Sequence, residues 1–371
     1  MIQDSIYYTK FTVSKAALLN SFIENGEQTI AELSEHLGVS VPYTTKILNE
    51  LVDEGLVGVT GKKENYAKRA PKIYGLIATS GYFLGIDAGK QSYTLGISDF
   101  CGNIVTQPEK IVIEYENSPE YLTQLLEFTN DYINRSGIER KMIKKGCMSI
   151  GGRVNPITGS AFSYLTFLDK PLAEELTERM GIPFCIDNDT RSMTYGEFLK
   201  GVCKGLKDVI FVNVSWGIGI GIICHCGKTG CMETETSGSA IVRKLRQALK
   251  EGATSVLSKK ITDENQEITL QDFLDAIRKE DVLCIDILQK VAEELGTNLA
   301  GIINTFNPEM LVIGGDLSVT GDYLIQPISM DIKKYSLNLV NKDSRIVLST
   351  LREKAGLTGA CLMARNRFLN G

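Results

Sequence analysis

The residues with the clearest chemical potential lie in one stretch of the chain, from Val212 to Ala240. An apolar run leads into glycines at alternate positions, Gly217, Gly219 and Gly221. Three cysteines follow within a span of eight positions, Cys224, Cys226 and Cys231. An acidic segment with Glu233 follows them. Glycines admit a phosphate close to the backbone, thiolates bind zinc, and a carboxylate accepts hydrogen bonds from a polar ligand, so the stretch indicates one of these three kinds of binding.

A second polar centre precedes this stretch. Asp187, Asn188 and Asp189 follow an apolar, strand-like segment. Asn offers donors and acceptors, and Asp can accept a hydroxyl proton, so the trio suits a polyhydroxy ligand or a general base. Asp189 could equally cap the next helix. Asp87 ends another apolar strand before Gly89, where it could hold a metal and phosphates or form a simple Asx-turn.

Alternating strands and helices must position these groups. From residue 79 onward, a strand hairpin followed by alternating helices and strands occurs twice, which predicts a duplicated α/β architecture. Gly314 and Gly315 follow a strand near the end of the second copy, where a ligand could approach the backbone. We therefore divide this part into residues 79–190 and 191–371, with the terminal helix packing back on the first lobe.

Residues 1–78 form a different kind of unit. Apolar spacing predicts a helix over Thr12–Glu24, and Thr29 with Glu32 predicts a capping box at the start of a second. Ser40 caps a third helix, with Pro42 in its first turn. A short helix, a glycine turn and a longer helix are typical of a helix-turn-helix. Its core residues are expected to be Ile47, Leu48, Leu51 and Val52.

A basic hairpin completes this unit. The sequence predicts strands over Leu56–Thr60 and Lys72–Leu76, with a turn at Gly61. Basic residues concentrate in this hairpin, although residues 1–78 as a whole hold eight basic and nine acidic residues. We interpret the unit as a DNA-binding winged helix; the alternative is a protein-binding helical domain with a solvated hairpin. The expected DNA-contacting residues are Ser40, Pro42, Tyr43, Thr44, Lys46, Lys68 and Arg69.

Composition sets the broad class. The 371 residues are 43% hydrophobic and 23% charged, as in ordinary globular proteins of several domains. Because no apolar run could span a bilayer and no signal peptide is evident, we expect a cytoplasmic protein without membrane contact. The net charge of −5 argues against non-specific coating of nucleic acid. Six of the nine cysteines are scattered singly in apolar contexts and are expected to be buried.

In this order, the motifs resemble those of the ROK family, named for repressors, open reading frames and sugar kinases. The resemblance covers essentially the whole chain. It implies an α/β fold with an N-terminal winged helix, which family repressors carry, followed by a duplicated actin-like (ribonuclease H-like) two-lobed sugar-kinase fold. Asp87-x-Gly89 resembles the first phosphate motif of the family and Gly217-x-Gly219 the second. Gly314-Gly315 resembles the glycines on the adenosine side.

The same resemblance implies a sugar site and a zinc site. Asn188 and Asp189 match the sugar-binding corner, in which Asp189 would be the catalytic base of a kinase, and Glu233 matches a further sugar contact. The zinc signature is matched by Cys224, Cys226 and Cys231. Family members take the fourth zinc ligand from a Glu-x-Gly-His segment, which would stand between Ile223 and Cys224 and is absent from the sequence. Either the protein lacks this segment or the chain omits it, and the intact flanking motifs favour omission.

The phosphate motifs depart from the family pattern. The kinase loop Asp-x-Gly-Gly-Thr is altered here, because Lys90 and Gln91 follow Gly89, and Trp216 stands before Gly217. We therefore expect no ATP or Mg²⁺ binding and no kinase activity. The sequence predicts a sugar-responsive repressor, a homodimer or homotetramer that binds operator DNA and a sugar or sugar phosphate between its lobes, with a structural zinc. The alternatives are a sugar kinase with a regulatory DNA-binding domain and a zinc-dependent interaction module.

Overall fold

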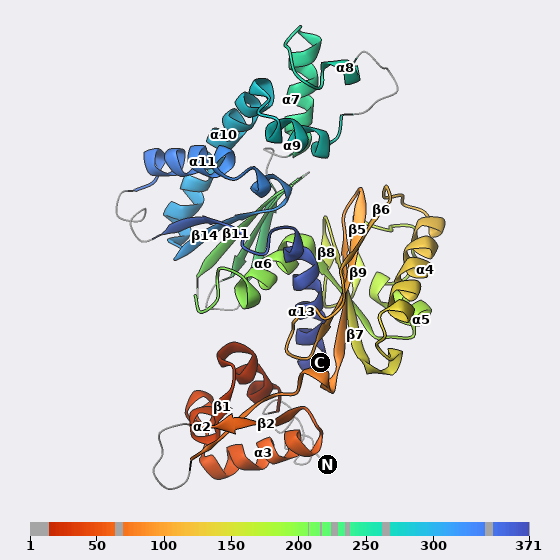
Figure 1. The fold of residues 1–371 in the computed structure, drawn as a ribbon, viewed down its shortest axis with the longest axis vertical. Helices are drawn as coiled ribbons and strands as arrows, with labels where there is room; N and C mark the ends of the chain where they lie inside the picture. Colours follow the sequence, from red (N-terminus) through yellow and green to blue (C-terminus); the bar gives the residue numbers. More distant parts are fainter. Residues whose placement is uncertain are drawn as a thin grey trace. The chain divides into compact units, whose positions relative to one another are not determined.

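The computed structural model describes residues 15–63, 70–206, 208–215, 217–223, 229–233, 238–261, 268–337 and 344–370 (Figure 1). Its contacts divide the chain into two compact units. The first comprises Met1–Asp189 and Leu357–Gly371, and the second comprises Thr190–Gly356. Among the described helices, none is both long and apolar enough to cross a membrane.

The first unit begins with a winged helix. A helix over residues 15–25 precedes α2 (Ile30–Leu37) and α3 (Val41–Asp53). The Oγ1 of Thr29 accepts from the N–H of Glu32, and the Glu32 carboxylate accepts from the N–H of Thr29, which confirms the predicted capping box. The wing consists of β2 (Val57–Lys62) and β3 (Lys72–Leu76), and the sheet order is β1-β3-β2 with β1 (Gln28–Thr29) at its edge.

Three local expectations for this unit were wrong. Val52 is 37% exposed, because the buried face of α3 runs through Ile47, Leu48 and Leu51 and turns away before Val52. Gly61 lies within β2 next to a β-bulge and pairs with Ile73 of β3, so it does not form the hairpin turn. Ser40 stands at the N-cap of α3, but its side chain makes no capping hydrogen bond.

The core of the winged helix continues into the first lobe. One apolar cluster joins residues of the winged helix, such as Leu18 and Phe22, to Phe83, Phe100 and Ala364 of the lobe. The rings of Phe83 and Phe368 lie 5.7 Å apart, and the side-chain amide of Asn20 donates to Asn370 Oδ1 over 3.2 Å. The winged helix therefore packs against the lobe, which explains why both belong to one compact unit.

The first lobe is built on a five-stranded sheet in the order β10-β7-β4-β5-β6. The strand β4 (Tyr82–Ala88) pairs antiparallel with β5 (Ser92–Asp99), and β5 pairs antiparallel with β6 (Glu109–Val112). In contrast, β7 (Ile143–Ile150) is parallel to β4, and β10 (Phe184–Asn188) is parallel to β7. Residues of α4 (Pro119–Arg135) and α5 (Leu172–Met180) share an apolar core with this sheet.

The C-terminal helix α13 (Ala355–Leu369) groups with this first unit from Leu357 onward. Residues 355–362 are all buried, and the Cys361 thiol donates to the carbonyl oxygen of Gly96 in β5. Five of the six scattered cysteines are buried and Cys101 is half-buried, and all six are free thiols, as expected for small apolar residues.

The second unit repeats the topology of the first lobe. Its sheet has the order β13-β12-β11-β14-β15. The strands β11 (Val209–Val214), β12 (Ile218–Ile223) and β13 (Thr229–Glu233) are antiparallel, and β14 (Met310–Gly314) and β15 (Arg345–Leu348) add on in parallel. In both sheets the chain forms three antiparallel strands and then extends the sheet from the first of them. The shared strand order of the two sheets confirms the predicted duplication.

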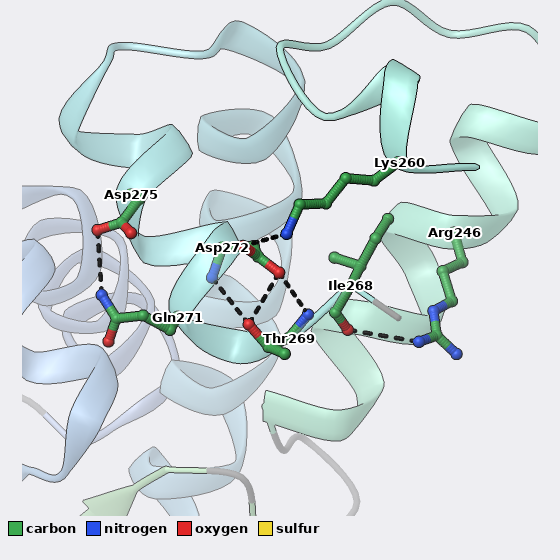
Figure 2. A network of polar contacts seen from close by, with 7 residues as sticks. All are labelled: Arg246, Lys260, Ile268, Thr269, Gln271, Asp272 and Asp275. Carbon is green, nitrogen blue, oxygen red and sulfur yellow. Dashed lines mark hydrogen bonds and ion pairs between the residues drawn. The ribbon is translucent and has the colours of Figure 1, made fainter. Parts of the chain in front are cut away.

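Helices share an apolar cluster with this second sheet. They include α7 (Gly238–Lys250), α9 (Leu270–Arg278), α10 (Val282–Phe306) and α11 (Asp322–Tyr335). Figure 2 shows how α9 begins: Thr269 and Asp272 form a reciprocal capping box, and Lys260 reaches Asp272 over 2.7 Å. Arg246 of α7 donates to the carbonyl of Ile268 in the same network, which fastens α7 to the start of α9.

Candidate ligand corner and DNA-binding surface

The polar corner of the first lobe stands at the carboxyl ends of two neighbouring parallel strands. Asn188 ends β10, and Gly152 lies just past the end of β7. The Nδ2 of Asn188 donates to the carbonyl oxygen of Gly152 over 3.0 Å and to Asp189 Oδ1 over 2.9 Å. Because parallel strands end at the same edge of a sheet, the fold brings these groups together. The sheet thus holds the predicted corner in a fixed arrangement.

The two carboxylates of this corner differ in their surroundings. Asp187 is only 4% exposed, and its Oδ1 accepts from the backbone N–H of Asn188 over 2.8 Å. Asp189 opens α6 (Asp189–Lys200) and stands beside Gly151, where an added Cβ would lie 3.6 Å from Asp189 Oδ2. Asp187 therefore supports the backbone of the corner, and Asp189 lies at a strand-to-helix junction, a position from which a carboxylate can meet a ligand hydroxyl.

The first phosphate motif forms the turn between β4 and β5. Asp87 lies in β4, and Gly89 donates its N–H to the carbonyl oxygen of Ser92 over 2.9 Å. The carbonyl oxygen of the exposed Lys90 accepts from the N–H of Tyr115 over 2.7 Å. The N–H of Gly89 is therefore already used within the turn, and Lys90 projects its side chain from the same turn.

The glycines of the second unit have packing roles. A Cβ at Gly219 of β12 would lie 2.1 Å from Thr190 Oγ1, so the absence of a side chain lets α6 approach the strand. Gly217 accepts from the N–H of Ser215 in the turn between β11 and β12. Gly315 has a φ of 84°, and a Cβ there would lie 2.3 Å from Asn213 Oδ1. Gly314 ends β14 directly before it.

Ser215 connects the ends of β11 and β14 within the second unit. Its hydroxyl donates to Asn213 Oδ1 over 2.9 Å and accepts from the N–H of Asp316 over 3.1 Å. Asn213 is only 4% exposed. The hydroxyl at the second phosphate motif therefore already bonds to neighbouring groups of the protein.

The strand β13 contains the backbone of Cys231 and Glu233. Cys231 stands opposite Gly221 of β12, and Glu233 stands opposite Gly219. The other predicted zinc ligands, Cys224 and Cys226, lie outside the described residues, as does Trp216. Among the described residues, no group of three metal-binding side chains occurs.

The expected omission of a segment between Ile223 and Cys224 was wrong. The sequence is continuous at this point, and Ile223 of β12 pairs with Thr229 of β13. With β12 and β13 paired directly, the sheet has five strands, as many as the sheet of the first lobe. The second lobe therefore completes its sheet without a further strand.

The DNA-binding surface was predicted on the first half of α3. Ser40, Pro42 and Lys46 are exposed there and Tyr43 is half-buried, while Lys68 and Arg69 lie outside the described residues. Thr44 was wrongly assigned to this surface. It is fully buried, and its Oγ1 donates to the carbonyl oxygen of Ser40 over 3.2 Å. Thr44 therefore supports the start of α3 from inside.

An ion pair fastens the wing to α2. The Nζ of Lys63, just past β2, lies 2.7 Å from Glu32 Oε1. Lys63 and the two bonds from Thr29 hold the pKa of Glu32 well below its usual value, at about 2. Glu32 thus stabilises both the start of α2 and the base of the wing.

Sequence reasoning missed Glu197, a fully buried carboxylate near the end of α6. It accepts from the N–H groups of Val202 and Leu351 over 2.9 and 2.7 Å and from the hydroxyl of Thr350 over 3.3 Å, and Ser349 donates a further bond. Glu197 thereby joins α6 to the segment that follows β15. No sequence pattern near Glu197 indicates its role, because its partners at residues 349–351 are distant in the sequence.

A winged helix joined to a duplicated α/β fold defines a class of sugar-kinase-like proteins with a DNA-binding module. The ROK family model matches residues 83–223 and 222–367, and the chain belongs to the ROK family. A winged helix-turn-helix DNA-binding model matches residues 15–57. The two ROK matches meet at residues 222–223, at the end of β12.

Similar proteins include repressors and kinases. The xylose repressor of Caldicellulosiruptor bescii is 24% identical over 96% of this chain and 96% of its own. The DNA-binding transcriptional dual regulator NagC of Escherichia coli is 23% identical over 97% and 94%. A glucokinase of Halalkalibacterium halodurans is 26% identical over 75% of this chain and 93% of its own.

The similar solved structures also include both a transcriptional regulator and a kinase. A ROK family transcriptional regulator, described as a homologue of the E. coli MLC protein, has a TM-score of 0.77 and covers 97% of both chains at 24% identity. A ROK glucokinase from Streptomyces griseus, in complex with glucose and AMPPNP, has a TM-score of 0.62 at 23% identity and covers 77% of this chain and 99% of its own. At these identities the likeness establishes the fold.

Proposed function

We propose that the protein is a sugar-responsive transcriptional repressor. The proposal is carried by the share of this chain that each similar protein covers. The xylose repressor and NagC match 96% and 97% of this chain, whereas the glucokinase matches 75%. The winged helix is matched by its own DNA-binding model. The proposal places the protein in the cytoplasm, where its DNA target lies.

DNA recognition rests on the exposed start of α3 and on the wing. Lys46 is exposed on α3, and Lys62 is exposed at the end of β2 in the wing. A helix of this kind reads base edges in the major groove with its first residues, while lysines of the wing neutralise phosphates. We propose that a homodimer or homotetramer presents two such modules to an operator, since paired modules recognise paired half-sites.

The effector site rests on Asn188 and Asp189. Their bonds to Gly152 and to each other preorganise an amide and a carboxylate at one sheet edge, an arrangement suited to the hydroxyls of a sugar. Glu233, on β13, would contribute a further carboxylate. Sugar binding changes the repressor through its different affinity for two conformations, one of which binds the operator better.

The alternative function is an ATP-dependent sugar kinase, with Asp189 as the base. The phosphate motifs support the repressor instead. The N–H of Gly89 and the hydroxyl of Ser215 bond to other groups of the protein, and Lys90 and Gln91 replace the glycine and threonine of the family loop. A phosphate cradle requires backbone N–H groups directed at the ligand, so these substitutions argue against ATP and Mg²⁺.

A structural zinc is part of the proposal. Cys224, Cys226 and Cys231 supply three thiolates, and structural zinc takes four ligands. Bound zinc would hold together the connection between β12 and β13 and so position Glu233. Metal analysis of the purified protein tests this: we expect about one zinc per chain, lost in Cys226→Ser. Protein without zinc after purification free of chelators would contradict it.

The DNA-binding part is tested by band shifts with DNA from upstream of the gene. We expect a specific complex that a scrambled fragment of equal length does not form, at roughly a thousandfold higher affinity or more. Equal binding of both fragments, with every sugar tested, would contradict a repressor. The kinase alternative is tested by ATP consumption over a panel of hexoses; sugar-dependent turnover that is lost in Asp189→Asn would favour it.

A further inference from the structure

An arginine stands next to the proposed effector corner. Arg153 directly follows Gly152, whose carbonyl oxygen holds the amide of Asn188. It also precedes β8 (Val154–Asn155), which pairs with β9 (Ser160–Ala161). The carbonyl of Arg153 accepts from the N–H of Phe162 over 3.0 Å, so this hairpin ladder extends to Arg153. The backbone of Arg153 is therefore fixed on the corner side of a short hairpin.

The side chain of Arg153 is held by an aromatic ring. Its guanidinium carbon lies 5.5 Å from the ring centroid of Phe162, within the range of a cation–π contact. Phe162 is itself 55% exposed, so the contact lies at the surface. A guanidinium that packs over a ring face in this way still has its N–H donors available to a ligand.

The charge of Arg153 has no acidic partner among the described residues. No ion pair joins it to a described carboxylate, and the two carboxylates of the corner accept from Asn188. Other arginines of this unit differ: Arg135 pairs with Glu109 over 2.9 Å, and Arg179 lies 3.8 Å from Glu175. A fixed, exposed guanidinium without an acidic partner is suited to bidentate binding of an oxyanion.

We propose that Arg153 makes the effector site selective for sugars that carry an oxyanion, either a phosphate ester or a carboxylate, over the neutral parent sugars. The inference rests on the proposed function, because it requires that Asn188 and Asp189 hold the sugar. Asn188 and Asp189 bind hydroxyls, and Arg153 binds the anionic substituent.

Calorimetric titration of the full chain with matched ligands tests the proposal. The probes are glucose, N-acetylglucosamine, their 6-phosphates, and glucuronate, with inorganic phosphate as the anion alone. We expect one charged sugar to bind about tenfold or more tightly than its neutral parent, the difference expected of a charge-assisted pair. The sugar 6-phosphates and glucuronate distinguish a site for a phosphate ester from a site for a carboxylate.

Variants assign the selectivity to Arg153. Arg153→Gln should remove the preference and leave the affinity for the neutral sugar nearly unchanged, whereas Arg153→Lys should keep part of it, because lysine retains the charge without the fork. Arg135→Gln is the matched control, since it removes an exposed arginine of the same unit and should preserve the preference. Melting temperatures establish that each variant is folded.

Two results would overturn the proposal while the proposed function stands: neutral sugars binding as tightly as charged ones, or a preference that survives in Arg153→Gln. Tight binding of inorganic phosphate without any sugar preference would also overturn it. Failure of every ligand to bind a protein that still binds its upstream DNA would overturn both this inference and the sugar response.

Discussion

The side-chain amide of Asn188 donates to the carbonyl oxygen of Gly152 over 3.0 Å, which ties the end of β10 to the end of β7. Asn188 is only 8% exposed, so water cannot readily replace this bond. The corner is thus part of the sheet. A ligand that binds there meets groups whose positions are already fixed, which lowers the entropic cost of binding.

Asn188→Ala should abolish measurable sugar binding and destabilise the first unit by about 1–3 kcal/mol, because it leaves the Gly152 carbonyl without its donor. Operator binding should persist, since Asn188 ends β10 in the sheet of the first lobe and is not part of the winged helix. Calorimetry with the effector and thermal melts measure the two effects. Asn134→Ala, an exposed substitution on α4, is the control. Unaltered sugar binding in Asn188→Ala would place the effector elsewhere.

Lys46→Ala should weaken operator binding and reduce the salt dependence of that binding by about one unit in the log–log slope, as expected when one phosphate contact is lost. Lys46 is exposed on α3, the predicted recognition helix. Fluorescence anisotropy at several salt concentrations measures the slope. Lys290→Ala removes an exposed lysine from α10 and should change neither quantity. Equal slopes for the two variants would exclude a phosphate contact by Lys46.

The lowered pKa of Glu32 predicts that the winged helix loses stability in acid. Its pKa is lowered from 4.5 to about 2 by Lys63 and by the bonds from Thr29. A lowered acid pKa contributes stability that is present above pH 4.5 and is lost as the pH falls toward 2. We expect hydrogen exchange of α2 to accelerate over this range in the native protein. Glu32→Gln should show faster exchange already at neutral pH, whereas Glu35→Gln, on the same helix, should not.

Glu197→Gln should destabilise the second unit by about 2–3 kcal/mol, because an amide cannot accept from all the donors that the buried carboxylate satisfies. Urea unfolding followed by circular dichroism measures the change. Glu251→Gln, at the exposed end of α7, should be nearly neutral. A neutral effect of Glu197→Gln would mean that the four donors around this carboxylate contribute little to the stability of the unit.

Local patterns predicted much of the fold correctly. The capping box at Thr29 and Glu32, the helices of the winged unit and the repeated strand order all follow from spacing over a few residues. The burial of Thr44 was also readable, because it precedes Ile47, Leu48 and Leu51 by three, four and seven positions and so shares their face. Its polar side chain led us to assign it to the surface, although threonine can bond to the carbonyl four residues back.

Other features depend on distant contacts that spacing does not reveal. The strand β1 has only two residues, too few for any periodic pattern, and forms because β3 pairs with it. Three of the four hydrogen-bond donors to Glu197 come from residues more than 150 positions away. Gly219 was predicted to approach a phosphate, but its missing side chain makes room for Thr190. In each case the tertiary neighbour determines the role.

The coupling between sugar and operator tests the central claim most directly. The affinity of the full chain for its upstream DNA is measured by fluorescence anisotropy with and without the sugar that calorimetry identifies. We predict that the sugar changes this affinity by roughly tenfold or more, a coupling typical of ligand-controlled proteins, and that Asn188→Ala removes the change. An operator affinity that is the same with and without bound sugar would contradict a sugar-responsive repressor.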